Sequence, residues 1–145
     1  LMGRAVQVFG ERNALAFEYV GLTAVFLAYG GLYWFGWGVA LAAALYVLDH
    51  VFFALALALK TYFQKIADPA DIAPTAAVAI TINHIAAVFL PAALGYLWLT
   101  APQAVFALAA GMAGVSLLLA LMIPRHPEPG HETVFARLRQ PAPAE

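Results

Sequence analysis

Two pairs of polar residues interrupt long apolar stretches of this chain. Asp49 and His50 lie within ALYVLDHVFFALALALK, and Asn83 and His84 lie within AVAITINHIAAVFL. Histidine titrates near neutral pH, and a neighbouring carboxyl group can share its proton. The two pairs therefore suit a proton relay or contact with a polar substrate. The alternative is that they only form hydrogen bonds that hold two helices together.

The composition predicts an integral membrane protein. The chain has 145 residues, of which 64% are hydrophobic and 10% are charged. Soluble domains have about 45–50% and about 25% of these classes. No Lys, Arg, Asp or Glu occurs between residues 72 and 123, a length that suits two membrane spans of roughly 20 residues each.

The apolar stretches predict an all-α fold of four membrane-spanning helices. Short connections make consecutive helices antiparallel, in an up-and-down arrangement. A transmembrane β-barrel is not expected, because the stretches lack two-residue alternation and exceed a strand of about 10 residues. The expected spans are residues 14–29, 36–59, 74–98 and 102–123, preceded by a loop at 1–13 and followed by a mobile polar tail at 124–145.

Basic and aromatic residues predict the orientation of these spans. Every basic residue falls before the first span, between the second and third, or after the fourth. By the positive-inside rule this side is cytoplasmic, so both termini are expected there, in a bacterial-type inner membrane. The three tryptophans and two tyrosines cluster at the opposite ends, as an interfacial belt would. The basic residues are Arg4, Arg12, Lys60, Lys65, Arg125, Arg137 and Arg139, and the aromatic ones are Trp34, Trp37, Trp98, Tyr33 and Tyr96.

The helical rise places the two polar pairs at one depth. Asp49 and His50 precede Lys60 by ten or eleven residues, roughly 15–17 Å, near the middle of a hydrocarbon core of about 30 Å. Asn83 and His84 lie roughly 14–15 Å along the next span. A charge at that depth costs roughly 2.5–3.5 kcal/mol and usually faces a partner or a wet cavity. We expect the second and third spans to pack together around this cluster.

Two further polar side chains lie within the expected spans. Tyr46 lies one helical turn from Asp49 and His50 and could hydrogen-bond to either. Glu18 lies near the cytoplasmic end of the first span, where we expect it to reach interfacial water or form a salt bridge.

Several classes of function are not expected. The absence of cysteine excludes disulfides and thiolate metal sites within the chain. The formal net charge of −1 gives no case for nucleic acid. His126 and His131 stand beside glutamates in the proline-rich tail, where solvation is a better explanation than metal binding. We predict no enzyme activity, no metal and no cofactor.

The N-terminal stretch GRAVQVFGERNAL resembles a degenerate cytoplasmic loop motif of the major facilitator superfamily, G-x-x-x-D-R-x-G-R-[RK]. Gly3, Gly10 and Arg12 occupy motif positions, whereas Gln7, Val8 and Glu11 replace its acid and two arginines. Without that acid the charge relay of the motif cannot be assembled from these residues. Gly3 and Gly10 are therefore either part of a conformational motif or only turn residues.

The order of the remaining elements also resembles the last third of such a carrier, including a late P-x-x-x-G in the third span. The resemblance implies helices nine to twelve of a twelve-helix secondary transporter, with both the missing N-terminal helices and a small-molecule substrate as partners. Asp49, His50, Asn83, His84 and Tyr46 would then couple protons or contact the substrate. The substrate, the coupling ion and the direction of transport are not readable from these residues.

Two alternatives remain open at this stage. His50 and His84 at similar depth on adjacent helices are the arrangement that a bis-histidine haem needs in a four-helix membrane cytochrome. A membrane assembly or scaffold protein that keeps a carrier-like fold without transporting is the other alternative.

The orientation is open to a direct test with single cysteines, since the chain contains none. Gln103→Cys, in the turn before the fourth span, should react in intact cells with a membrane-impermeant thiol reagent. Gln64→Cys, beyond the second span, should react only after the cells are opened. Labelling of Gln64→Cys but not Gln103→Cys in intact cells would overturn the orientation.

Overall fold

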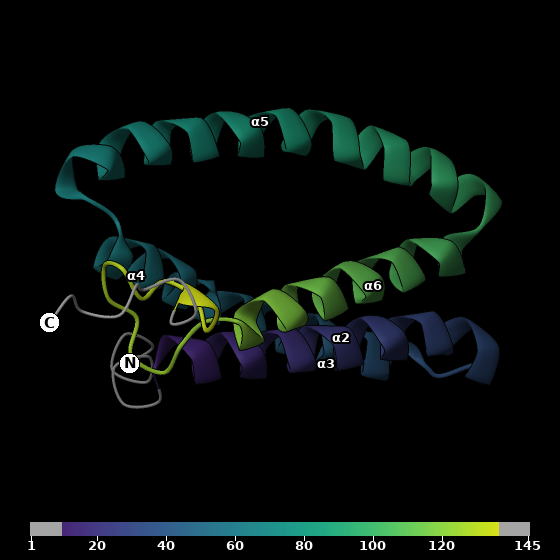
Figure 1. Cartoon of the computed structure of the whole chain (residues 1–145). Helices are drawn as coiled ribbons and strands as arrows, with labels where there is room; N and C mark the ends of the chain where they lie inside the picture. Colours follow the sequence, from purple (N-terminus) through teal and green to yellow (C-terminus); the bar gives the residue numbers. More distant parts are fainter. Residues whose placement is uncertain (1–9, 137–145) are drawn as a thin grey trace, which may run out of the picture.

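The computed structural model describes residues 10–136, which form helices joined by very short connections. In chain order these are α2 (Glu11–Phe35), α3 (Val39–Phe53), the 3-10 turn η1 (Ala54–Ala56), α4 (Leu57–Ile66), α5 (Pro69–Thr100) and α6 (Pro102–Leu121). The segments α3, η1 and α4 make up one span, Val39–Ile66. Consecutive spans run in opposite directions (Figure 1). The expected all-helical chain with four helices long and apolar enough to cross a membrane is thus confirmed.

The first helix continues past the point at which the sequence suggested its end. Gly30 and Gly31 were expected to end it, yet α2 runs on to Phe35. A glycine inside a helix costs only about 1 kcal/mol relative to alanine. The helix instead ends at Gly36, whose φ of 62° is the left-handed conformation that favours glycine at this position.

The loop expected between the second and third spans is almost entirely helical. The helix α4 continues beyond Lys60 to Ile66, and α5 begins at Pro69 rather than near Pro74. The side chain of Asp68 caps α5 by accepting a hydrogen bond of 2.9 Å from the amide of Ala70. An N-cap carboxylate followed by proline at the first helical position is a strong start signal, and it fixes the helix start ahead of Pro74.

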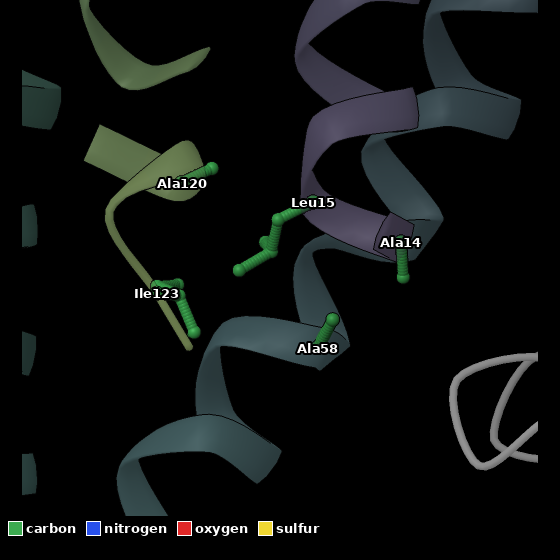
Figure 2. Close-up of a cluster of buried hydrophobic side chains, with 5 residues drawn as sticks. All are labelled: Ala14, Leu15, Ala58, Ala120 and Ile123. Carbon is green, nitrogen blue, oxygen red and sulfur yellow. The ribbon is translucent and has the colours of Figure 1, made fainter. Parts of the chain in front are cut away.

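The helix α2 is the centre of the packing. It contacts α6 along much of its length and also contacts α3, η1 and α4. Small side chains of α6 are buried, which lets the helix axes approach closely. Figure 2 shows Leu15 of α2 between Ile123, just beyond α6, and Ala58 of α4. The buried alanines of α6 are Ala110, Ala113 and Ala120.

The helix α5 stands apart from this group. It arches away from the other helices and returns to them only where it joins α6 (Figure 1). None of its residues is buried, and α6 is the only described helix with which it packs appreciably. The expectation that the second and third spans pack together is therefore wrong for the described residues. Because α5 lacks charged side chains beyond Asp71, its long apolar surface is available for partners other than α3 and α4.

The segment after α6 folds back over the end of the bundle at which α2 begins and α4 ends. The Tyr62 hydroxyl donates a hydrogen bond of 2.5 Å to the carbonyl of Glu132. The amide of Val134 donates one of 2.9 Å to the carbonyl of Met122. We call this end the basic end, because four of the described basic residues lie at it: Arg12, Lys60, Lys65 and Arg125.

The close contact between α2 and α3 predicts that replacing Gly21 by a larger residue lowers the stability of the protein. A Cβ atom at Gly21 would overlap the ring of Phe52, which packs edge-to-face on Phe17 at 5.5 Å between centroids. Overpacking costs about 1–3 kcal/mol. We expect Gly21→Ala to be less stable than Gly111→Ala by about that amount, since a Cβ at Gly111 meets nothing within 4 Å.

Thermal unfolding in detergent measures this difference. In a Phe52→Leu background the gap between the two alanine variants should largely disappear. Equal melting temperatures for Gly21→Ala and Gly111→Ala in the parent background would contradict the close approach of α2 and α3.

Candidate functional site

Asp49 and His50 form a direct pair near the middle of the span Val39–Ile66. The Nδ1 atom of His50 lies 3.6 Å from Oδ2 of Asp49 and 3.0 Å from the carbonyl oxygen of Tyr46. A carbonyl oxygen only accepts, so the shorter contact requires a proton on Nδ1. The neutral imidazole then keeps its Nε2 lone pair available to accept a second proton.

Tyr46 supports the imidazole, though not through its hydroxyl group. Its ring lies 4.3 Å from the His50 ring between centroids, at an interplanar angle of 44°. Together with the backbone hydrogen bond, this contact holds His50 along its own helix. The expected hydrogen bond from the Tyr46 side chain to Asp49 or His50 does not occur among the described residues.

The pair is open to its surroundings. The side chains of Asp49 and His50 are 28% and 58% exposed. On the neighbouring helix, the Tyr29 hydroxyl donates a hydrogen bond of 3.3 Å to the carbonyl of Ala42, about two helical turns before Asp49. Exposure of a carboxylate to lipid carries a high free-energy cost. The exposure therefore indicates that the surface around Asp49 faces water or further protein in its membrane.

A change in helix geometry follows the pair within one turn. The 3-10 turn η1 (Ala54–Ala56) separates α3 from α4. Short 3-10 stretches inside a helix often mark hinges. Interrupted membrane helices are also where carriers commonly place their binding sites. The pair thus lies beside the one break in regular helix geometry within this span.

Asn83 and His84 lie on α5 and do not join this pair. Both are exposed, and α5 does not pack against α3. His84 directs Nδ1 to the carbonyl of Ile80 at 2.8 Å, which repeats the arrangement of His50 and also leaves Nε2 available. The predicted four-residue cluster is therefore wrong as a packed unit of the described residues. Its two halves face outward from separate helices.

Two buried glutamates on α2 were not recognised as a feature of the core. Glu18 is 2% exposed, and its Oε2 has no hydrogen-bond partner among the described residues. The expectation that the Glu18 carboxyl reaches interfacial water or forms a salt bridge is therefore wrong for the described residues. Glu11 is 3% exposed and pairs with Lys65 of α4 at 2.6 Å. Glu18 lies seven residues after Glu11, two helical turns along the same face, a spacing that could have indicated a shared buried side.

Two of the three loop-motif residues, Gly10 and Arg12, lie at the basic end. Gly10 is the N-cap of α2, with a φ of 77°. Arg12 lines a pocket beyond the end of α6. Gly3 lies outside the described residues. The role of Gly10 is to begin the helix, and the geometry offers no acidic partner for Arg12 among residues 10–136.

The arrangement of the described residues also bears on whether the chain could bind a metal ion or haem. The described part of the chain contains no group of three or more His, Cys, Asp or Glu side chains that could hold a metal ion. For the haem alternative, His50 and His84 each keep Nε2 available. Their helices do not pack together, so no shared core between the two imidazoles is formed by these residues.

Comparison with protein-family models, with characterised proteins and with solved structures finds no match to this chain. A proposal for the function therefore rests on the geometry of the described residues and on the motif resemblance.

The ion pair between Glu11 and Lys65 should be worth more than an ordinary surface pair. Lys65 is half exposed, but the Glu11 carboxylate is buried, and removing the amine leaves it without that partner. Loss of one member of a fully buried pair costs about 3–5 kcal/mol. We discount this to about 1–2 kcal/mol for Lys65→Gln, because solvent screens the exposed amine and the α2 N-terminus also favours the carboxylate.

Thermal unfolding of Lys65→Gln, compared with Lys60→Gln, checks this expectation. Lys60 is exposed at the same end and forms no ion pair within residues 10–136, so its variant should unfold like the parent. If both variants unfold like the parent, Glu11 does not depend on Lys65.

Proposed function

We propose that this chain is the C-terminal, four-helix portion of a secondary active transporter that resembles the major facilitator superfamily. In this proposal it moves a small solute across the inner membrane by alternating access, and protons drive the movement. The observation that carries the proposal is the Asp49–His50 pair, 3.6 Å apart and partly exposed in the middle of an apolar span.

The cost of the pair supports a functional role. Interhelical hydrogen bonds in membranes contribute only about 0.6 kcal/mol on average. A carboxylate in the middle of a span costs several times that amount. Moreover, the pair makes no interhelical hydrogen bond among the described residues, so it does not hold α3 to a neighbour. Helix packing therefore gives little reason for an acid at this position.

The chemistry of the pair suits transfer of a proton. Nδ1–H of His50 is held by the Tyr46 carbonyl, which leaves Nε2 as the atom that accepts a proton. The neighbouring carboxylate of Asp49 stabilises the imidazolium that results. Release of the proton returns the ring to its neutral form.

The arrangement of the helices supports a carrier built from more than these four spans. The helix α5 offers apolar surface on all sides and packs on α6 alone. Carriers of the proposed type enclose a midplane site between two halves that rock against each other. Further helices of the same carrier would cover α5 and complete the cavity that the Asp49–His50 pair faces. His84, exposed on α5, would then contact those helices or the substrate.

Replacement of the acid tests the proposal. In the intact carrier, Asp49→Asn keeps the size and hydrogen-bonding capacity of the side chain but removes its ionisation. We expect proton-driven uphill uptake to fall by about a hundredfold or more, the size of a lost acid–base step. Expression and thermal stability should change little, because the side chain makes no interhelical hydrogen bond within the described residues.

The matched control is Asp71→Asn, which removes an exposed acid in the first turn of α5. It should transport like the parent. If Asp49→Asn also transports like the parent between about pH 5 and about pH 8, where histidine titrates, the pair does not couple protons. A visible haem absorption band in the purified protein, lost in His50→Ala and in His84→Ala, would instead support the cytochrome alternative.

A further inference from the structure

A pocket rich in positive charge lies at the basic end, just beyond the last residue of α6. Its volume is about 360 Å³. Arg12 comes from the first turn of α2, and Arg125, His126 and His131 come from the segment that follows α6. We call these four residues and the space between them the basic pocket. Its remaining lining residues are Pro124, Thr133 and Val134.

The basic pocket has little internal neutralisation. Neither Arg12 nor Arg125 forms an ion pair with an acid within residues 10–136. Glu128 and Glu132 lie on the same segment, and neither lines the pocket. Glu132 directly follows His131. Hydrogen bonds from the backbone amides of Glu132 and Gly130 lower the pKa of this carboxyl, so it is ionised at neutral pH. Each of these two acids offsets at most one positive charge, and neither forms an ion pair with a guanidinium group within residues 10–136, so both guanidinium groups remain for an anion.

An apolar groove adjoins the basic pocket. Its volume is about 390 Å³, and it runs between α2, α4 and α6. Leu15, Leu59 and Leu119 are among its lining residues, with Ser116 of α6 among the few polar ones. Thr133 lines both the groove and the basic pocket. A cationic pocket and an apolar groove therefore meet at one residue.

We infer that the basic pocket and the apolar groove form a single binding site for an anionic phospholipid. The phosphate of the headgroup would accept hydrogen bonds from Arg12 and Arg125, whose planar guanidinium groups suit phosphate oxygens. One acyl chain would lie in the groove between α2, α4 and α6. This assignment does not depend on whether the chain transports a solute.

Position along the helices favours a lipid over a free anion. Arg12 lies in the first turn of a membrane-spanning helix, and Arg125 lies four residues after the end of another. Both are thus at the level where apolar helix gives way to polar chain, which is where lipid headgroups lie. Basic pockets at helix ends on one membrane face commonly bind anionic headgroups. A free phosphate would use the pocket but would leave the apolar groove without a role.

Native mass spectrometry of the purified protein in a neutral detergent tests the site. Phosphatidylglycerol and phosphatidylcholine are titrated separately, and inorganic phosphate is titrated in the same way. We expect phosphatidylglycerol to bind more tightly than either of the other two. Each of Arg12→Gln and Arg125→Gln should weaken its binding about fivefold, the effect expected for one basic residue near an anionic lipid. The lysine-for-arginine variants keep the charge but lose the planar fork, so they should recover part of the binding. Thermal unfolding of the glutamine variants like that of the parent shows that they fold.

The groove is tested separately with Ser116→Phe, which fills it. This variant should weaken phosphatidylglycerol binding and leave inorganic phosphate unaffected. The controls are Lys60→Gln, a basic residue outside the pocket, and Leu118→Phe, on the exposed face of the same helix. Both should bind lipid like the parent.

Three results would overturn the assignment. One is equal weakening by Lys60→Gln and by the two arginine variants, which would indicate general surface charge. Another is binding of inorganic phosphate as tight as that of phosphatidylglycerol, with no effect of Ser116→Phe, which would indicate a free-anion site. The third is unchanged lipid binding in both arginine variants.

Discussion

The burial of Leu15 is the contact on which the arrangement of these helices depends. This side chain is 1% exposed and lies where α2, α4 and the end of α6 meet, at the basic end. Three of the side chains clustered with it are alanines, Ala14, Ala58 and Ala120, so three segments approach one position. The buried carboxylate of Glu11 and its partner Lys65 lie at the same end and join α2 to α4. Above this level α2 stays in contact with α3 and α6, whereas α5 stands apart from the other described helices except where it packs on α6.

The separation of α5 from α3 explains the character of the candidate site. Packing is dense where the polar groups at the basic end are paired, and it is sparse around Asp49 and His50. A partly exposed pair in the middle of an apolar span is stable only if water or further polar groups cover it. The pair and the open face of α5 therefore both support the proposal that further helices of a larger membrane assembly cover these spans.

The sequence predicts some of these features and not others, for physical reasons. The number of spans follows from hydrophobicity alone, because a bilayer requires about 20 apolar residues for each. The ends of the helices were harder to predict. Gly30 and Gly31 are residues typical of a turn, yet α2 continues past them. There α2 packs on α6, with Tyr29 stacked on Phe106 at 5.3 Å between ring centroids. The Asp49–His50 pair was predictable because neighbours in sequence stay neighbours in a helix. Its separation from Asn83 and His84 was not, since equal depth says nothing about which helices touch. The seven-residue spacing of Glu11 and Glu18 indicates that they share one face of α2, but it does not indicate that this face is the one that packs.

The connections at the two ends of α5 limit how this helix can move. Only Ala67 and Asp68 separate it from α4, and only Ala101 separates it from α6. Chain of that length spans at most about 4–7 Å, so neither end can travel far from the helix to which it is joined. The helix α5 can therefore neither slide far along its own axis nor move away from the bundle as a whole. The motion that these connections allow is a rotation about the line through the two ends of α5. In this rotation the ends stay in place, and the middle of the helix, with Asn83 and His84, moves furthest. Any partner that settles against α5 thus selects an angle of this rotation, and the two polar side chains at its centre turn towards or away from Asp49 accordingly.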